Sequence, residues 1–395
     1  MSAAPPPKTK ELQALAGLFL KLGTISFGGP AAHTALMEEE VVRRRKWLTP
    51  AEFLDLVGAT NLIPGPNSTE LAIHIGHRRA GWPGLVVAGA CFILPAMLIV
   101  SVIAWAYVRF GTLPEASALL YGVKPVIIAI VLQALWNLGK SAVKTKLLAA
   151  AGIVAAAASF LGGNELLVLF GCGFALLAIR AADKKKPVAV GGFAPLFANL
   201  PGTSTAATAT TAVATSIAVA APFSLNLMFF FFLKVGAVLF GSGYVLLAFL
   251  RADLVERWHW LTESQLLDAI AVGQFTPGPV FTTATFIGYL LSGPAGALVA
   301  TVGIFLPAFI FVALSAPLIP RLRASPLAGA FLDGVNVASL ALMAVVTWQL
   351  GSAALTDGLT IALAVIAATL LIRWRLNSAW LVLGGATIGL LKSFL

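Results

Sequence analysis

Long apolar runs recur along the whole chain, and short polar stretches separate them. Most runs are about 17 to 25 residues long, the length that an α-helix needs to cross about 30 Å of hydrocarbon. The pattern therefore predicts an all-α polytopic membrane protein. The apolar segments lie near residues 12–30, 51–76, 84–108, 116–139, 147–163 and 165–180, and near 226–248, 263–290, 296–318, 327–350, 358–373 and 378–394.

The same tripeptide interrupts two of these segments. Pro64-Gly65-Pro66 and Pro277-Gly278-Pro279 each lie inside an apolar run. Proline lacks the backbone donor that a helix needs and clashes with the preceding turn, while glycine adds backbone freedom. Each segment should therefore break and restart as a new helix. Broken helices in corresponding halves of a transporter indicate its binding site, because irregular backbone in a membrane needs surrounding protein or a polar cavity.

The chain contains an internal duplication. At a constant offset of 213, Lys21 aligns with Lys234 and Trp47-Leu48-Thr49 aligns with Trp260-Leu261-Thr262. After a slip of one residue, Gly122 aligns with Gly334. The duplication predicts a tail at 1–10, a membrane repeat at 11–180, a linker at 181–224 and a second membrane repeat at 225–395.

Capping signals mark where the second segment of each repeat begins. Thr49 is followed by Pro50 and by Glu52, and Thr262 is followed three residues later by Gln265. A hydroxyl residue three positions before Glu or Gln is the pattern of a capping box. We therefore expect a helix to begin at each of these positions.

Loop charges predict opposite orientations for the two repeats. In the first repeat, eleven Lys and Arg residues lie in the amino terminus and in the loops after segments two, four and six, against five in the other loops. The positive-inside rule then places the amino terminus in the cytoplasm. In the second repeat the bias reverses, which predicts an inverted repeat. Residues 204–222 carry no charge and are expected to form a linking span, with a flexible linker as the alternative. The expected total is thirteen spans and an external carboxyl terminus.

Composition excludes a soluble globular protein, because 59% of the residues are hydrophobic and 11% are charged. The net charge of +10 lies mostly in short loops, so it indicates a lipid bilayer rather than nucleic acid as the partner. The start of the chain is a short polar tail and not a signal peptide. Cys91 and Cys172 are expected to be small core residues, and the four histidines form no metal set. We expect no cofactor and no metal.

Two lysines lie inside apolar segments at equivalent places. Lys21 and Lys234 are about ten residues into their helices, where a charge costs roughly 2.5 to 3.5 kcal/mol on insertion scales. Snorkelling to the membrane surface is the alternative. Glycine-rich backbone follows each lysine and could form an anion-binding concavity, at Gly28, Gly29, Gly241, Ser242 and Gly243.

Small polar residues follow each Pro-Gly-Pro, where the new helices should start. A helix amino terminus offers unpaired N–H donors and about half a positive charge to an anion. Two such ends flanked by two lysines predict a pocket for a small tetrahedral oxyanion, although the hydroxyls would cap their own helices in any case. The residues are Asn67, Ser68, Thr69, Thr282 and Thr283.

Two further ionisable residues are candidates for coupling. Glu70 has no acidic counterpart in the second repeat and is either a proton-coupling carboxylate or a counter-ion for Lys21 or Lys124. Lys124 aligns with Asn336, which indicates that the halves have diverged around one asymmetric site. The acidic and basic run at 38–46 resembles an amphipathic helix at the membrane surface, with most of its charge solvated.

The paired motifs closely resemble the chromate ion transporter family in its long, two-domain form. The resemblance rests on Phe27-Gly28-Gly29-Pro30, Asn61-Leu62-Ile63-Pro64-Gly65-Pro66-Asn67-Ser68-Thr69-Glu70 and Gln274-Phe275-Thr276-Pro277-Gly278-Pro279, and it covers essentially the whole chain. It implies chromate export and chromate resistance at a bacterial plasma (inner) membrane, through antiparallel halves, with sulfate as a competing or exchanged anion. It leaves open whether the chain acts alone or as a homodimer.

Three other functions are alternatives to chromate export. Uptake of sulfate or another oxyanion, or sulfate/chromate exchange, would use the same scaffold with Glu70 as the coupling group. A passive anion channel would lack saturation and counterflow. A membrane-embedded enzyme is disfavoured because the intramembrane carboxylates Asp55, Glu70, Asp268 and Asp333 form no recognisable catalytic set.

Overall fold

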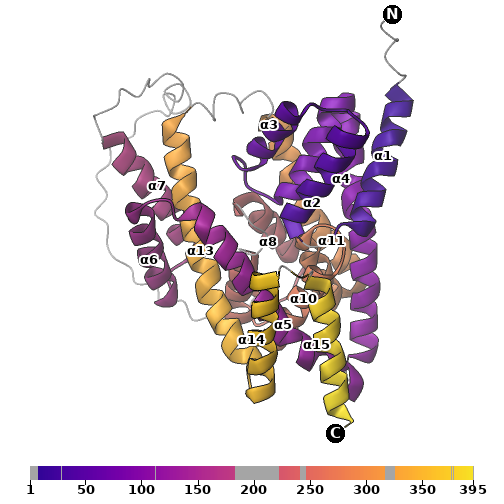
Figure 1. The fold of residues 1–395 in the computed structure, drawn as a ribbon, viewed down its shortest axis with the longest axis vertical. Coiled ribbons are helices and arrows are strands. Elements are labelled where there is room, and N and C mark those ends of the chain that lie inside the picture. Colours follow the sequence, from indigo (N-terminus) through magenta and orange to yellow (C-terminus); the bar gives the residue numbers. More distant parts are fainter. Residues whose placement is uncertain are drawn as a thin grey trace, which may run out of the picture.

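The computed structural model describes residues 8–27, 29–111, 113–182, 222–240, 246–315, 325–374, 376 and 378–394, and all regular structure within them is helical (Figure 1). The predicted linking span at 204–222 lies almost wholly outside the described residues. The amino terminus and the carboxyl terminus lie at opposite ends of the molecule. The helical secondary structure agrees with the all-α class expected from the sequence.

The two halves contain the same order of elements. The first half has α1 (Lys8–Ile25), α2 (Gly29–Glu38), the π-helix η1 (Glu39–Arg44), α3 (Pro50–Thr60), α4 (Asn67–Phe110), α5 (Pro114–Ala142), α6 (Lys146–Phe160) and α7 (Glu165–Ala182). The second half has α8 (Leu225–Val238), α9 (Leu246–Leu250), the π-helix η3 (Arg251–Arg257), α10 (Glu263–Phe275), the 3-10 helix η4 (Val280–Thr282), α11 (Thr283–Ser315), α13 (Pro326–Ala354), α14 (Gly358–Trp374) and α15 (Ser378–Ser393). Both predicted capping boxes are present, at the starts of α3 and α10.

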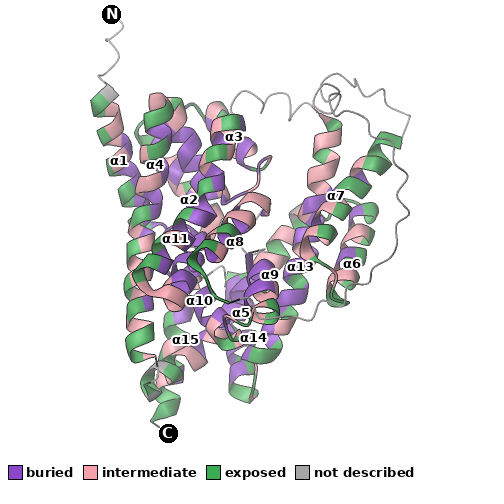
Figure 2. Ribbon diagram, turned by 180° about the vertical axis from the view of Figure 1, so that it is seen from behind, coloured by how far each residue is buried: buried purple, intermediate pink, exposed green. Residues whose placement is uncertain are grey.

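Five stretches of helix in the described part of the chain are long and apolar enough to cross a membrane. They are Asn67–Phe110, Ser117–Lys140, Glu165–Ala182, Val280–Ser315 and Pro326–Ala354. Buried residues concentrate along α8, α10 and α11, whereas the outer faces of α1, α6 and α15 are exposed (Figure 2). Large apolar side chains such as Leu161 and Trp348 lie on the outside, as a lipid-facing surface requires.

α4 and α11 each contain a sharp reversal. Non-helical backbone at Ala80 and Gly81 divides α4, and Ser292 and Gly293 divide α11 in the same way. The arms on either side lie against each other, because a Cβ added at Gly76 would come within 2.2 Å of the carbonyl oxygen of Gly84. In α11, the hydroxyls of Thr285 and Thr301 are 2.7 Å apart across the reversal. Each long helix is therefore an antiparallel pair of helices.

The Pro-Gly-Pro sequences lie at the tips of helical hairpins. The chain breaks at both places, as predicted, but there it turns back on itself instead of continuing in the same direction. Arg78 near the end of the first arm of α4 pairs with Glu52 at the start of α3, with 2.9 Å between Nη2 and Oε1. A Cβ added at Gly273 in α10 would lie 2.0 Å from the Thr283 hydroxyl at the start of α11. The single broken spans expected over 51–76 and 263–290 are therefore wrong, because the glycine between two prolines reverses the chain.

The first helices of each half also turn back. Arg79 pairs with Glu11 at the start of α1, with 3.5 Å between their charged atoms, and stacks on Trp47, which follows η1. In the second half, Phe223 before α8 packs against Trp260 after η3 with ring centroids 5.1 Å apart. The start and the end of each segment thus lie together. The single spans expected over 12–30 and 226–248 are replaced by hairpins.

The last helix of each half packs against the other half. α15 packs on α5 and α7 packs on α13. A Cβ added at Gly122 would lie 1.9 Å from the Gly385 carbonyl oxygen, and one added at Gly334 would lie 2.8 Å from the Cα of Gly173. These two contacts are equivalent in the repeat, because both pairs of glycines are related by the offset of 212. The halves therefore share one core.

Candidate functional site

Each Pro-Gly-Pro tip contacts the helix break of the other half. The Gly65 N–H donates to the carbonyl oxygen of Leu239 at 2.6 Å, and the Gly278 N–H donates to the carbonyl oxygen of Ser26 at 2.9 Å. The offset of 213 relates Gly65 to Gly278 and Ser26 to Leu239. The two hydrogen bonds are therefore one interaction made twice, and four breaks in the helices meet at the boundary between the halves.

Only glycine fits at these tips. Gly65 has φ +138° and Gly278 has φ +91°, a region that other residues rarely adopt. A Cβ at Gly65 would lie 2.2 Å from Oε1 of Glu70, and a Cβ at Gly278 would lie 2.6 Å from Cβ of Ala96. The backbone N–H groups at the tips are thus held in close contact with neighbouring elements.

Buried polar atoms without partners lie close to both tips. Both carboxyl oxygens of Glu70 and the hydroxyl of Thr69 are buried and have no hydrogen-bond partner among the described residues. The same holds for the Ser26 hydroxyl and for Nδ1 of His33, whose Nε2 lies 3.1 Å from the Ser26 carbonyl oxygen. Leaving such atoms unpaired costs about 1 to 3 kcal/mol each, so this region is a candidate for binding water, a proton or a ligand.

Ser26 and His33 were not identified from the sequence. In the second repeat their positions are occupied by Leu239 and Leu246, so the duplication gives no signal for them. The one clue is that Ser26 immediately precedes the expected break at Phe27-Gly28. The site is therefore more polar on the first-half side than the repeat predicts.

The predicted helix-start residues differ between the halves. α4 begins at Asn67, whose side-chain amide donates to Oδ1 of Asn61 at 2.9 Å across the tip. Ser68 is buried in the same turn. In the second half, the hydroxyls of Thr282 and Thr283 donate to the carbonyl oxygens of Pro279 and Val280. These two threonines are satisfied by their own backbone, whereas Thr69 is not.

Each predicted lysine is paired with a carboxylate of its own half. Lys21 Nζ lies 2.7 Å from Oε1 of Glu40, and Lys234 Nζ lies 2.5 Å from Oδ2 of Asp253. Nothing in the described contacts brings the two lysines together or joins either one to Glu70. Glu40 was expected in a solvated helix face, but it is buried. The hydrogen bond from Lys21 lowers the pKa of Glu40 below its usual value, with Arg45 and Arg44 adding to the effect.

The alternative role of Glu70 as a counter-ion is wrong. Lys21 pairs with Glu40, and Lys124 pairs with Asp268 at 3.1 Å. Lys124 also donates to the hydroxyl of Ser264, and Asp268 accepts a hydrogen bond from Tyr107 at 2.8 Å. Lys124 therefore belongs to a separate, partly buried cluster that joins α4, α5 and α10.

Some predicted glycines cannot be placed. Gly28, Gly241, Ser242 and Gly243 lie outside the described residues, so the expected anion-binding concavities stay a prediction. Gly29 begins α2 with φ +81°, which is a backbone conformation suited to such a concavity. Among the described residues no group of three His, Cys, Asp or Glu side chains could hold a metal ion.

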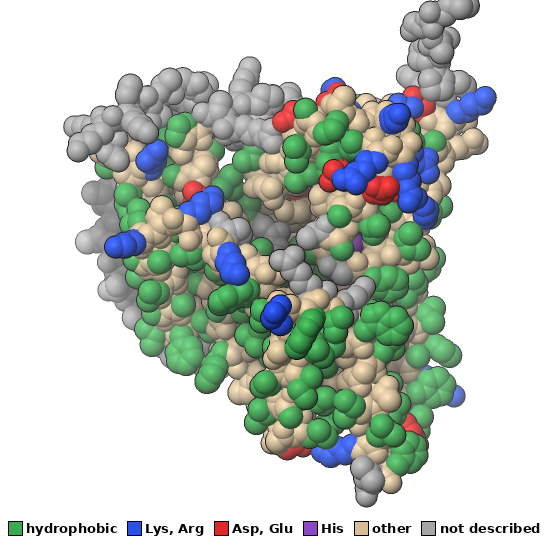
Figure 3. Space-filling view, in the orientation of Figure 1, with side chains coloured by type: hydrophobic (Ala, Val, Ile, Leu, Met, Phe, Trp, Pro, Cys, Tyr) green, Lys and Arg blue, Asp and Glu red, His purple; other side chains and the backbone are tan. Residues whose placement is uncertain are grey.

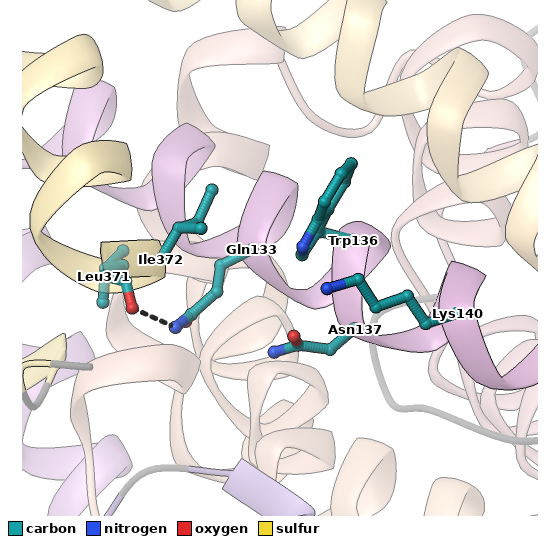
Figure 4. A pocket seen from close by; sticks show the side chains of 6 residues that line it. All are labelled: Gln133, Trp136, Asn137, Lys140, Leu371 and Ile372. Atoms are coloured by element: carbon teal, nitrogen blue, oxygen red, sulfur yellow. Dashed lines mark hydrogen bonds between the residues drawn. The ribbon is translucent and has the colours of Figure 1, made fainter. Parts of the chain in front are cut away.

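A cavity of about 390 Å³ lies between α5 and α14, away from the tips (Figure 4). Gln133, Asn137 and Lys140 line it from one face of α5, and Gln133 donates to the Leu371 carbonyl oxygen at 2.9 Å. The Lys140 ammonium lies over the ring of Trp136, 4.6 Å from its centroid. None of the candidate site residues predicted from the sequence lines this cavity.

Comparisons with known proteins identify one family. The family model described as Chromate transporter matches residues 13–177 and 226–390. The chain is 34% identical to the chromate transport protein of Cupriavidus metallidurans, over 97% of this chain and 93% of that protein. It is 33% identical to a probable chromate transport protein of Synechococcus elongatus, over 93% of this chain and 91% of that protein. It is 30% identical to the chromate transport protein of Pseudomonas aeruginosa, over 98% and 93% of the two chains. No solved structure matches.

Proposed function

Because the chain belongs to the chromate transporter family, we propose that this chromate transporter carries its substrate out of the cell. The family and the named relatives are transporters, so the chain is not an enzyme. The observation that supports a transport site is the reciprocal pair of hydrogen bonds between each Pro-Gly-Pro tip and the break of the opposite half. Irregular backbone at the meeting point of two repeats is where transporters place their substrate.

Export is the direction that the membrane potential favours. Moving one charge through 100 mV is worth about 2.3 kcal/mol, so expelling a dianion from a negative interior gains roughly twice that. Uptake would need coupled cations. Sulfate has the same charge and a similar tetrahedral shape, so uptake or exchange of sulfate is the alternative. The chromate accumulation experiment described below distinguishes it from export.

The two halves are proposed to be inverted repeats related by a pseudo-twofold axis in the membrane plane. The exchanged glycine contacts and the reciprocal tip contacts support this symmetry. Each of the four hairpins is proposed to enter and leave on the same side, with those of the two halves on opposite sides of the membrane. The expected thirteen crossings would then become nine, if the linker at 204–222, which lies almost wholly outside the described residues, is counted as one. Arg43 to Lys46 then lie on the same side as the amino terminus, which strengthens the charge bias of the first half. Arg251 and Arg257 move to the opposite side, which weakens the bias of the second half.

We expect the protonation state of Glu70 to control binding of the oxyanion, which makes Glu70 the candidate for coupling a proton to transport. Its carboxyl group is fully buried beside Gly65 and has no partner among the described residues. An unpaired ionised carboxylate in such a place costs several kcal/mol, so the neutral form is favoured there. A neutral carboxyl can donate to an oxyanion at the tip, whereas an ionised one repels it. Binding of chromate and protonation of Glu70 would thus favour each other.

Radiolabelled chromate accumulation in intact cells tests the direction of transport. Cells that express the protein should accumulate less chromate than cells with an empty vector, and a protonophore should remove the difference. Excess sulfate measures competition on the same carrier. Higher accumulation that sulfate blocks would instead identify an oxyanion importer and would overturn the export proposal.

Replacing Lys21 or Lys234 by alanine should lower the rate of chromate transport at least about tenfold, because each supplies a cation inside its repeat. Membrane insertion should be intact, as judged by the amount of protein in purified membranes. Lys140→Ala, which removes a lysine next to Trp136 in the separate α5 cavity, is the matched control. Unchanged kinetics in both repeat variants would remove these lysines from the mechanism.

A further inference from the structure

The lysine pairs belong to a three-residue cluster that occurs once in each repeat. In the first half, Glu40 contacts Lys21 at 2.7 Å and Arg44 at 3.3 Å. In the second half, Asp253 contacts Lys234 at 2.5 Å and Arg257 at 3.5 Å. The offset of 213 relates every member of the two clusters. Arg45 is a third cation on Glu40, at 3.4 Å, and has Trp258 as its counterpart.

The carboxylates lie inside these clusters and the cations reach outward. The side chains of Glu40 and Asp253 are 9% and 12% exposed, whereas those of Lys21 and Lys234 are 48% and 37% exposed. Within each three-residue cluster two cations face one carboxylate, although Arg44 also pairs with Glu39, and Glu165 lies within electrostatic reach of Lys234 and Asp253. Figure 3 shows charged side chains of both signs gathered on the lobe that contains α1 to α4. An incoming anion would therefore meet the cations first and find one carboxylate already bound to them.

Both carboxylates stand on unusual backbone. Glu40 and Asp253 lie in the π-helices η1 and η3, where Arg45 N–H donates to the Glu40 carbonyl oxygen and Trp258 N–H donates to the Asp253 carbonyl oxygen, both at 2.9 Å. Shortly after each π-helix comes a residue with positive φ: Lys46 has φ +52°, and its counterpart His259 has φ +54°. π-helical turns are rare and occur often at functional sites, and positive φ in other residues than glycine is strained. Both halves thus contain the same energetically unfavourable backbone, a π-helix followed by a residue with positive φ.

A carboxylate held by a lysine and an arginine resembles a bound oxyanion. Lys234 and Arg257 lie on different oxygens of Asp253, whereas Lys21 and Arg44 both lie on Oε1 of Glu40 and Arg45 lies on Oε2. Both oxygens of each carboxylate thus face cations, as two oxygens of chromate or sulfate would. We propose that Glu40 and Asp253 are internal competitors of the transported oxyanion: each occupies its cation cluster in the empty transporter and yields it when the oxyanion binds. This inference rests on the proposed transport function. It assigns an oxyanion-exchange site to each half of the protein.

The role of competitor predicts a gain in affinity that a purely structural ion pair does not. Glu40→Gln and Asp253→Asn keep the size of the side chain but remove its charge, so chromate no longer has to displace an anion. The KM for chromate should fall by about threefold or more, while the maximal rate falls because release is slower. Glu40→Asp keeps the charge and should keep a KM close to that of the unmodified protein.

The experiment measures chromate flux into proteoliposomes together with the amount of folded protein after size-exclusion chromatography. Glu38→Gln is the matched control, because Glu38 is a nearby and more exposed carboxylate and pairs with Arg43, which lies outside the cluster. Its KM should be unchanged. An unchanged or raised KM in both Glu40→Gln and Asp253→Asn would overturn the inference, and so would loss of folded protein in both. If the unmodified protein carries no chromate, the proposed function fails instead.

Discussion

We expect replacement of Gly65 or Gly278 by alanine to abolish chromate transport and to leave the protein in the membrane. Alanine at either place must adopt a backbone conformation that costs of order 1 to 3 kcal/mol. Its Cβ would also come within 2.2 Å of Oε1 of Glu70 or within 2.6 Å of Cβ of Ala96. The tip must then move away, which breaks the hydrogen bond to the opposite half. Because the two tips are equivalent, both substitutions should have the same effect.

Chromate efflux from proteoliposomes containing equal amounts of each variant measures this effect. Gly17→Ala is the neutral control, because nothing lies within 4 Å of a Cβ added there. Gly81→Ala is a second control, because Gly81 also has a positive φ of 64° but faces open space at the reversal in α4. Transport at the unmodified rate in Gly65→Ala and Gly278→Ala would show that the tips do not form the substrate path.

We expect replacement of Glu70 by glutamine to remove the pH dependence of chromate binding. Glutamine is neutral at every pH and can donate a hydrogen bond, so it imitates the protonated carboxyl. In the unmodified protein, binding should weaken as the pH rises and Glu70 loses its proton, because the carboxylate repels the dianion. In Glu70→Gln, binding should persist at alkaline pH, but any proton flux that accompanies chromate transport should be lost.

Two assays separate binding from coupling. Equilibrium binding of labelled chromate across a pH series gives the first quantity, and a pH-sensitive dye inside proteoliposomes gives the proton flux. Titration of the anion itself affects both proteins alike, so the comparison isolates Glu70. Glu52→Gln removes an exposed carboxylate that pairs with Arg78 and should keep the pH profile of the unmodified protein. An identical pH profile in Glu70→Gln would exclude Glu70 as the coupling group.

The lysines show where the sequence alone was insufficient. Their repetition at one offset identified Lys21 and Lys234 as functional candidates, but the same offset also relates Glu40 to Asp253 and Arg44 to Arg257. Glu40 lies in a run of acidic and basic residues that resembles a solvated helix. Glu40 is buried because the chain turns back after α1 and brings η1 against Lys21, which the local sequence does not reveal.

The sequence by itself determined the membrane class, the duplication, the two breaks at Pro-Gly-Pro and the starts of α3 and α10. These features follow from local rules: the length of apolar runs, the missing donor of proline, the freedom of glycine and the capping of a first turn. The tertiary structure alone decided that the broken segments are hairpins and that each tip contacts the opposite half. A kinked span and a hairpin have the same hydropathy, so hydropathy does not distinguish them. The tertiary structure likewise decided the partner of each charge, because that depends on the direction in which the chain leaves the break.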